Sequence, residues 1–247
     1  MEGAVRLETH DLVPGYSGHA LFDGLQLTLR AGELVCLMGP NGIGKSTLIR
    51  SLAGLQRPLH GSVKFPTSSE SHKPVAVVLA DKISGVDLTA YELISFGRYP
   101  YLDWTISFRE TDLAVIENTI DIVNIRELAD KKIYELSDGQ LQMVMIARAL
   151  AQESDVLLLD EPTAHLDLNN RLEIMNLLRR LAKASGKAIL TATHELDLAL
   201  QTADFIWLAT RDKKMITGVP EDLILSGAFD EVFQFKGYDL ETGKVTQ

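Results

Sequence analysis

The most constraining feature of the sequence is a glycine-rich stretch that directly follows an apolar run. Residues Leu34–Met38 read as a buried strand, and residues 39–47 (GPNGIGKST) match the pattern G-x-x-x-x-G-K-[ST] before a helical segment. Glycines let backbone N–H groups converge on an anion, and a helix N-terminus adds partial positive charge. A glycine turn that binds nothing is the alternative, and it is disfavoured because strand, loop, lysine and serine are all in register. The stretch predicts a nucleotide-binding protein.

The polar residues of this loop have distinct expected roles. Lys45 should neutralise the β- and γ-phosphates, Ser46 should ligate Mg²⁺, and Thr47 should reach the α-phosphate. The nucleotide contacts expected from the loop are therefore Gly39, Pro40, Asn41, Gly42, Gly44, Lys45, Ser46 and Thr47.

Composition narrows the class further. A chain of 247 residues can bury a substantial core in one domain, and its formal net charge of −10 argues against a general nucleic-acid binder. Cys36 is the only cysteine, so no internal disulfide or multi-cysteine metal site can form. The N-terminal residues lack the apolar core of a signal peptide, and no apolar run is long enough to span a membrane. A cytosolic location is expected.

Half-buried antiparallel strands are expected at residues 4–9 and 25–29, where apolar and polar residues alternate. Further strands are expected at 62–65 and 75–79. Tyr16 lies in a turn cluster between the first two strands. It could stack on a flat base, or it could be an ordinary turn tyrosine, which the local sequence favours.

The middle of the chain reads as helical. Thr89 and Glu92 have the spacing of a capping box and should open a helix that runs to about Arg98. The aromatic cluster at 99–104 either packs on its own lobe or is exposed for a partner, and its loop position leans towards a partner. A second helix is expected at 111–124, with Leu113, Ile116, Ile120 and Val123 on one face.

Two more stretches carry candidate chemistry. Residues 136–140 (LSDGQ) form a Ser-x-x-Gln capping box before a helix, and residues 155–162 form a buried strand that ends in Asp160 and Glu161. Neighbouring side chains at an extended strand end point opposite ways, so one carboxylate could hold Mg²⁺ while the other polarises a water. A solvated acidic turn is the alternative. His194 follows another apolar strand, 188–193, and is placed to contact a γ-phosphate.

Taken together, the order of these motifs resembles the ATP-binding subunits of ABC transporters, from about residue 5 to about residue 225. The resemblance implies an α/β fold: a P-loop NTPase (RecA-like) core with a mainly parallel sheet, an N-terminal antiparallel β subdomain and an inserted α-helical subdomain. Residues 1–247 would be one ABC ATPase domain, with its core at 1–80 and 149–225. The helical subdomain, which includes residues 136–140, would cover 81–148, and 226–247 would be a short C-terminal tail.

The resemblance also implies residue roles. Tyr16 would stack on adenine, so the resemblance favours a binding role for Tyr16 over that of an ordinary turn tyrosine. Asp160 would belong to the Mg²⁺ shell with Ser46. Glu161, His194 and Lys45 would be catalytic. Residues 136–140 match the family's signature sequence, hereafter the signature, which grips ATP held by the other subunit. Contacts across the dimer would therefore come from Ser137, Gly139, Gln140 and Asp167.

The implied function is ATP- and Mg²⁺-dependent transport at the cytoplasmic face of the cell membrane. A homodimer of this chain would dock on integral permease subunits near residues 80–105 and act indirectly with a periplasmic or lipid-anchored substrate-binding protein, with no nucleic-acid partner. Stretches 97–101 and 220–227 resemble importers of iron chelates, haem or cobalamin. The runner-up is a non-transport ABC ATPase that acts on soluble partners, such as an iron–sulfur assembly ATPase. A small-molecule kinase is disfavoured because it has no use for the signature.

Two departures from the family pattern stand out. Asp138 replaces the first glycine of the signature's usual Gly-Gly pair, and its charge is unfavourable beside a γ-phosphate unless the side chain points away. The family also expects a glutamine after the strand at 75–79, where this chain has Ala80 and Asp81. Alanine cannot ligate a metal, so either Asp81 substitutes or the contact is absent.

Overall fold

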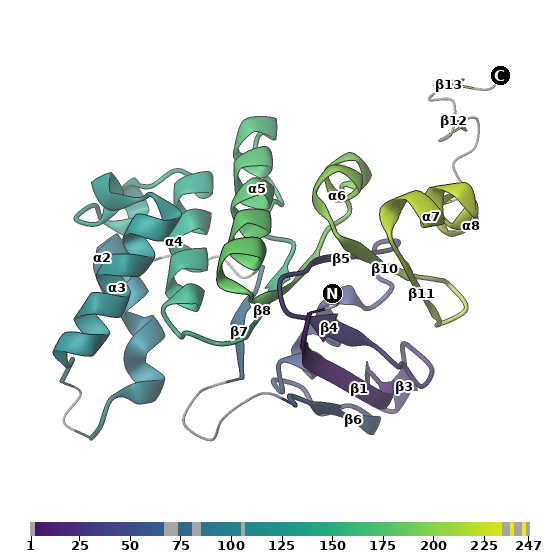
Figure 1. Ribbon diagram of the computed structural model, residues 1–247, viewed down its shortest axis with the longest axis horizontal. Coiled ribbons are helices and arrows are strands. Elements are labelled where there is room, and N and C mark those ends of the chain that lie inside the picture. The colour runs from purple at the N-terminus through teal and green to yellow at the C-terminus, as the bar shows by residue number, and fades with distance from the viewer. Residues whose placement is uncertain are drawn as a thin grey trace.

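A six-stranded sheet forms the centre of the protein. The computed structural model describes residues 3–66, 74–80, 85–104 and 107–233, together with the backbone of two short strands near the C-terminus. The strand order is β11-β10-β5-β9-β8-β7, in which only the β10–β11 pair is antiparallel. The strands, in that order, are Met215–Gly218, Phe205–Ala209, Leu34–Met38, Ala188–Ala192, Val156–Asp160 and Val75–Val78 (Figure 1).

The three central strands, β5, β9 and β8, are buried at every position. Their continuous apolar runs fit strands that are covered on both faces. Because they are parallel, their carboxyl ends meet at one edge, where Leu37 pairs with Ala192 and Ala192 pairs with Asp160. β7 is only half-buried, as befits its place at the edge of the sheet.

A second, antiparallel sheet lies beside the first. Its order is β4 (Thr28–Arg30), β1 (Val5–Val13) and β6 (His60–Lys64). Helix α1 (Lys45–Leu52) shares one apolar core with both sheets, which includes Leu7, Leu29, Leu37, Leu48 and Leu52. The expected strand 25–29 is shorter than predicted, because Leu25 makes only an isolated bridge to Leu12. The turn cluster expected around Tyr16, residues 14–18, includes the short strand β2 (Gly15–Tyr16), which forms a small hairpin with β3 (His19–Ala20).

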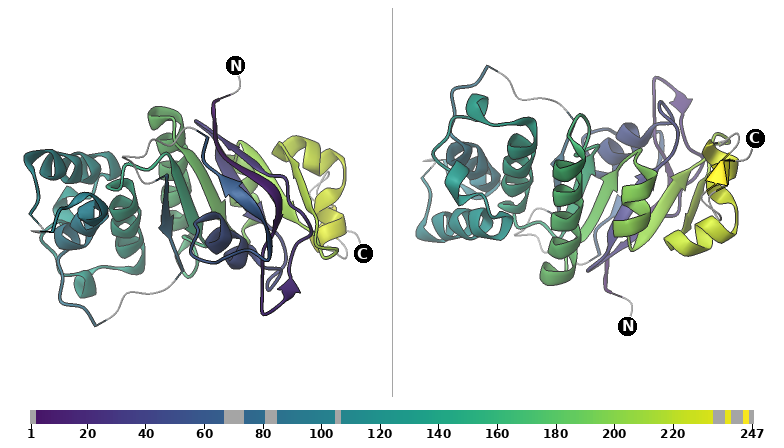
Figure 2. Two further views of the ribbon diagram at one scale, coloured as in Figure 1. Left: turned by 90° about the horizontal axis from the view of Figure 1, so that it is seen from below. Right: turned by 90° about the horizontal axis from the view of Figure 1, so that it is seen from above.

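The opposite face of the central sheet is covered by helices α5 (Leu168–Ser185), α6 (Leu196–Thr202), α7 (Pro220–Leu225) and α8 (Ala228–Phe233) (Figure 2). Helix α5 is capped by Asp167 at its start and by Gly186 at its end, where the left-handed φ of 65° fits a glycine. Helix α8 lies within the segment expected to be a tail, and its Phe229 is fully buried. The two short strands β12 (Tyr238–Asp239) and β13 (Lys244–Val245) pair with each other.

A group of helices lies at one end of the molecule, between β7 and β8 in the chain (Figure 1). It contains α2 (Ala90–Ser95), η1 (Phe96–Tyr101), α3 (Glu110–Val123), η2 (Arg126–Leu128), η3 (Ile133–Glu135) and α4 (Asp138–Leu150). Thr89 and Glu92 form the predicted capping box. The helix that they open ends at Ser95, and a 3₁₀ segment follows that contains Pro100. Leu113, placed on the apolar face of α3 by the sequence pattern, is 41% exposed.

Arg98 ties this helical group to the chain segment that enters β8. Its guanidinium is buried and pairs with Asp112 at 3.0 Å and Glu153 at 2.8 Å. It also donates to the carbonyl of Ala151 at 2.7 Å and lies 4.3 Å from the centre of the Tyr101 ring. The aromatic cluster is therefore split, because Tyr101 packs on its own lobe while Trp104 is 92% exposed.

The observed architecture confirms the predicted fold class: a mainly parallel core, an antiparallel β unit and an inserted helical group. Within the part of the chain that the structure describes, no helix combines the length and apolar character needed to cross a membrane.

Candidate nucleotide-binding and hydrolysis site

The glycine-rich loop joins β5 to α1 at the carboxyl edge of the central sheet. A side chain at Gly39 would place its Cβ 2.8 Å from the Ala209 carbonyl oxygen, and one at Gly44 would meet Leu21 at 2.8 Å. Both positions have left-handed φ values, 148° and 111°, so glycine is required on two grounds. Gly44 precedes α1 and offers no side-chain acceptor to its first turn. The N–H groups of that turn are thus available to an anion.

Lys45 is held inside the loop. Its side chain is 5% exposed, and Nζ donates to the carbonyl oxygens of Gly39 at 2.9 Å and Pro40 at 3.3 Å. Burial lowers the pKa of the Lys45 ammonium, and the charges of Glu161 and Asp160 offset part of that effect. The cation is therefore partly desolvated, which strengthens its attraction to an incoming phosphate, while the two carbonyl oxygens hold it in the loop.

Ser46 and Asp160 meet across the site. The Ser46 hydroxyl donates to Asp160 Oδ1 at 3.0 Å, joining the first turn of α1 to the end of β8. Burial raises the pKa of Asp160, while the hydrogen bond from Ser46 opposes that rise. Hydroxyl and carboxylate oxygens are ligands that suit Mg²⁺. No cluster of three metal-binding side chains occurs among the described residues.

Glu161 and His194 face each other at the ends of the neighbouring strands β8 and β9. His194 Nδ1 lies 3.7 Å from Glu161 Oε2, and the two side chains are 50% and 30% exposed. Glu161 has a φ of 48°, so it does not continue the extended strand. The expectation that alternation along a strand separates Asp160 from Glu161 is thus wrong in its reason. A left-handed turn redirects the second carboxylate to the solvent-accessible side of the site.

The signature and Asp167 lie at two helix starts that touch each other. Ser137 caps α4 by accepting from Gln140 N at 3.2 Å, and Gln140 Oε1 accepts from Ser137 N at 3.1 Å. Asp167 caps α5 and also accepts from the Asn170 side chain at 2.7 Å. A Cβ at Gly139 would lie 2.8 Å from the Asn170 side chain, so glycine permits this close approach. Ser137, Gly139, Gln140 and Asn170 border a hollow of about 230 Å³.

Tyr16 lies on the β2–β3 hairpin and is 57% exposed. The chain runs from that hairpin to Leu21 and Phe22, which pack against the Gly44 position. Ala80 follows β7, whereas Asp81, the alternative ligand considered for the absent glutamine, lies outside the described residues.

The structure brings Lys45, Ser46, Asp160, Glu161 and His194 together through direct contacts or shared electrostatics. The signature residues and Asp167 form a separate group. Sequence reasoning missed Arg171 and Glu195, which form an ion pair beside the site at 3.2 Å. Their signal was available, since Glu195 directly follows His194 and Arg171 stands four residues after Asp167.

A phosphate-binding loop at the carboxyl edge of a parallel sheet, with two carboxylates at the end of another strand of that sheet, defines an α/β P-loop nucleotide-binding protein. The family model described as ABC transporter matches residues 22–164. The chain belongs to this family of ABC transporter ATP-binding subunits, which are ATPases.

Individual relatives agree with the family assignment. The chain is 35% identical over 238 residues to the petrobactin import ATP-binding protein FpuD of Bacillus anthracis, covering 93% of this chain and 87% of the relative. It is 30% identical to the ferric enterobactin transport ATP-binding protein FepC of Escherichia coli K12, over 94% of this chain and 88% of the relative. A solved ABC transporter assigned to the metal-chelate type, in an inward-facing conformation, matches with a TM-score of 0.84 at 27% identity, covering 93% of this chain and 89% of the other.

The buried carboxylate at the site should weaken the stability of the free protein. Replacing Asp160 by Asn is expected to stabilise the protein without nucleotide by roughly 0.5–1 kcal/mol at neutral pH. Burial raises the Asp160 pKa above its unfolded-state value, so between these two pKa values the native state binds more protons than the unfolded state. The free energy of unfolding therefore falls as the pH rises from the unfolded-state pKa through the native-state pKa. Urea unfolding of both proteins between about pH 4 and about pH 8 measures the difference. The advantage of Asn should shrink towards low pH, and a pH-independent difference contradicts this account.

Proposed function

We propose that this chain is the ATP-hydrolysing subunit of an importer, and that two copies enclose two ATP molecules. The carrying observation is the convergence of Lys45, the Ser46–Asp160 pair and the Glu161–His194 pair at one edge of the sheet. This set offers a cation for phosphate, oxygen ligands for a metal, and a carboxylate beside an imidazole. Phosphoryl transfer needs these groups, because catalysis in this reaction rests mainly on positioning and electrostatic stabilisation.

Each residue has a defined task in this proposal. Lys45 and the loop amides offset charge on the β- and γ-phosphates, and Ser46 and Asp160 hold Mg²⁺. When bound, Mg²⁺ neutralises charge that develops on the transferring phosphoryl group. Glu161 orients or deprotonates the attacking water, and His194 contacts the γ-phosphate. The 3.7 Å separation of Glu161 and His194 supports a common target for the two side chains.

The dimer proposal rests on the second group of candidates. Ser137 is exposed and caps α4 with a capping box, Asp167 is exposed and caps α5 through the Asn170 N–H, and Gly139 lets the two helix starts touch. A helix N-terminus with a capping serine offers N–H groups and a hydroxyl to an anion. We propose that this surface of one copy binds the γ-phosphate held by the loop of the other. Tyr16 is exposed enough to stack on adenine.

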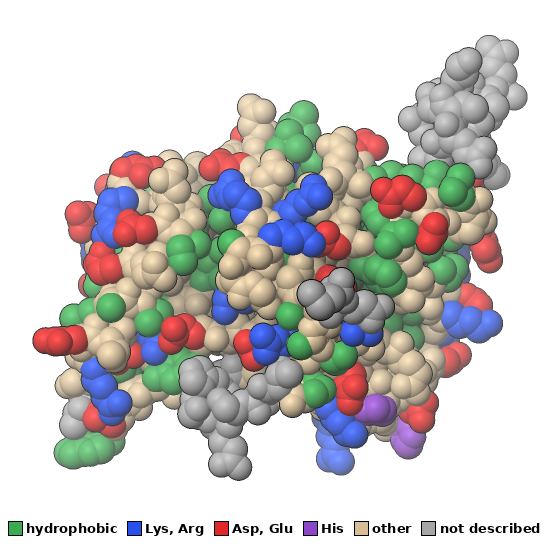
Figure 3. Space-filling model, in the orientation of Figure 1, with side chains coloured by type: hydrophobic (Ala, Val, Ile, Leu, Met, Phe, Trp, Pro, Cys, Tyr) green, Lys and Arg blue, Asp and Glu red, His purple; other side chains and the backbone are tan. Residues whose placement is uncertain are grey.

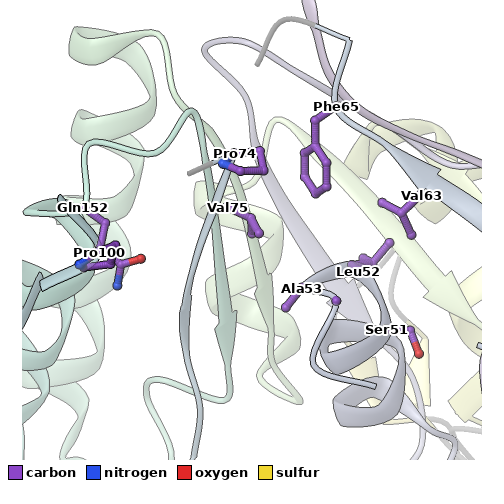
Figure 4. A pocket seen from close by; sticks show the side chains of 10 residues that line it. Ser51, Leu52, Ala53, Val63, Phe65, Pro74, Val75, Pro100 and Gln152 are labelled. Carbon is purple, nitrogen blue, oxygen red and sulfur yellow. The ribbon is translucent and has the colours of Figure 1, made fainter. Parts of the chain in front are cut away.

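An apolar groove between the core and the helical group supports a permease partner near residues 80–105. The groove has a volume of about 440 Å³ and runs from the end of α1 past β7 to Pro100 and Gln152 (Figure 4). Its lining includes Leu52, Ala53, Val63, Phe65, Pro74 and Val75. Tyr99 and Trp104, which stand close to the lining residue Pro100 in the chain, are exposed. Exposed apolar surface next to a groove is typical of protein interaction sites.

This partner would place the chain at the cytoplasmic face of a membrane, with a substrate-binding protein acting indirectly through the permease. The sequence resemblance allows an iron chelate, haem or cobalamin as the cargo. Among these three, the relatives named for petrobactin import and ferric enterobactin transport favour an iron chelate. A nucleic-acid partner is disfavoured, because acidic and basic side chains are mixed over the face in Figure 3 and the net charge is −10.

Membrane fractionation tests the transport assignment. Expressed alone, the chain should stay in the supernatant. Co-expressed with the multi-span membrane proteins encoded near its gene, one of which this proposal expects to be its permease, it should pellet with membranes. Trp104→Asp should reduce the pelleted fraction, since an exposed aromatic anchor is replaced by a charge. Leu225→Asp, at another exposed apolar residue on α7, serves as the matched control. A chain that remains soluble with every membrane protein encoded nearby would favour the soluble-partner ATPase instead.

A further inference from the structure

Glu195 holds three segments of the site together. Its carboxylate accepts from Thr163 Oγ1 at 3.3 Å, in the loop that follows Glu161, and pairs with Arg171 at 3.2 Å, on α5. Its own backbone N–H donates to Thr193 Oγ1 at 3.1 Å. The residue directly before it in the chain is His194. The two residues that flank His194 in the chain, Thr193 and Glu195, are thus held by hydrogen bonds and an ion pair.

Arg171 grips two partners with one guanidinium. Nε donates to the carbonyl oxygen of Leu166 at 2.6 Å, and a terminal nitrogen pairs with Glu195 Oε2. Leu166 is buried and immediately precedes Asp167. The planar fork of arginine can bind two acceptors in a fixed relation, which an ammonium cannot do. The guanidinium therefore links the backbone carbonyl of Leu166, next to Asp167, to the side chain of Glu195, next to His194.

The burial of these groups makes the link stiffer than a surface ion pair. The Glu195 side chain is 12% exposed, and both Thr163 and Thr193 are 2% exposed. Arg171 itself is 34% exposed, so its outer edge reaches solvent while its inner edge is held. Exposed pairs contribute little because their side chains are mobile and screened, whereas shielded and hydrogen-bonded charges keep a defined geometry.

We propose that Arg171 and Glu195 are positioning residues that tie the orientation of His194 to the position of the Asp167 loop. This inference rests on the proposed roles of His194 at the γ-phosphate and of Asp167 at the dimer interface. In that setting, a partner subunit that moves the Asp167 loop also moves the carbonyl of Leu166. Arg171 and Glu195 transmit the shift to His194, so hydrolysis in one copy responds to closure of the dimer around it.

The alternative is that the pair merely anchors α5. The two roles differ in what they do to kinetics. Loss of an anchor lowers stability and affects binding and turnover alike, whereas loss of a positioning pair lowers kcat and leaves KM for ATP nearly unchanged. Among the residues that the structure describes, the phosphate loop forms no hydrogen bond or ion pair with Arg171 or Glu195, and this loop is expected to carry most of the nucleotide contacts.

Steady-state ATP hydrolysis by the purified full-length chain tests the proposal. Arg171→Gln and Glu195→Gln should each reduce kcat about 10-fold or more, with KM within about 2-fold. The double variant should be no slower than either single variant, because both remove the same link. Arg171→Lys should recover only part of the rate. Arg179→Gln is the matched control, since Arg179 lies on the same helix and donates to the Gln201 carbonyl at 3.3 Å, away from the site.

The overturning results are equally defined. Single variants within about 2-fold of the wild-type kcat, or losses that multiply in the double variant, contradict the positioning role. A parallel His194→Ala variant separates this inference from the proposed function: if it hydrolyses ATP at the wild-type rate, the role of His194 itself fails. If His194→Ala is inactive while Arg171→Gln is fully active, only the present inference fails. Should Arg171→Gln not fold, Glu195→Gln and Arg171→Lys decide the outcome.

Discussion

Replacing Glu161 by Gln is expected to abolish steady ATP turnover while leaving ATP binding intact. General-base assistance contributes about 10²–10⁴-fold, so kcat should fall by that factor. The amide has nearly the same shape as the carboxylate, and Glu161 acts on the phosphate loop through the charge that it presents to Lys45. Binding should tighten slightly, because one negative charge beside the triphosphate is removed. Phosphate release and nucleotide fluorescence titration, on the same preparation, measure the two quantities.

The matched control for this variant is Glu221→Gln, on the exposed surface of α7. It also removes one carboxylate, and it should hydrolyse ATP at the wild-type rate. Turnover by Glu161→Gln within about 10-fold of wild type would remove Glu161 from the role of base or water-orienting group.

Replacing Lys45 by Met should destroy nucleotide affinity. The buried ammonium is the main positive charge available to the β- and γ-phosphates, and removing one member of a buried charge pair costs about 2–5 kcal/mol. Affinity for ATP should therefore fall by at least about 30-fold. Methionine fills a similar volume, and burial already disfavours the lysine charge, so the free energy of unfolding should change by less than about 1 kcal/mol.

Lys132→Met is the control for this second prediction. Lys132 pairs with Asp87 at 2.9 Å in the helical group, so its loss removes a cation without touching the phosphate loop. ATP affinity should be unchanged in that variant. A Lys45→Met protein that unfolds, or that binds ATP as tightly as wild type, would contradict the assignment of Lys45 as the phosphate-binding cation.

The sequence predicts most of the core because local patterns determine it. The apolar runs at β5, β8 and β9 require burial on both faces, and the glycines of the loop require a backbone that only glycine adopts freely, so these elements follow from short stretches. The capping boxes at Thr89 and Ser137 are also local, and both are present. Helix and strand ends were less predictable. The helix expected to run to about Arg98 ends as α2 at Ser95, because Pro100 and the tertiary contacts of Arg98 favour the 3₁₀ segment η1 there.

The connections between distant residues could not be predicted from local patterns. Glu161 has a left-handed φ where the chain leaves β8, and this conformation depends on the packing around the end of the strand and not on the neighbouring residues in the sequence. Arg171 and Glu195 lie 24 residues apart in the chain, and although each stands near a candidate site residue, no local pattern shows that the two pair with each other. The exposure of Leu113 is likewise decided by which face of α3 the rest of the lobe covers.

A structure of the Glu161→Gln protein with ATP and Mg²⁺ tests the central claim most directly. The account predicts a twofold dimer with two ATP molecules, in which each γ-phosphate lies at hydrogen-bonding distance, about 2.7–3.2 Å, from Lys45 of one copy and Ser137 of the other. A tight dimer in which Ser137 contacts no phosphate, or a monomer that hydrolyses ATP in solution, would contradict it.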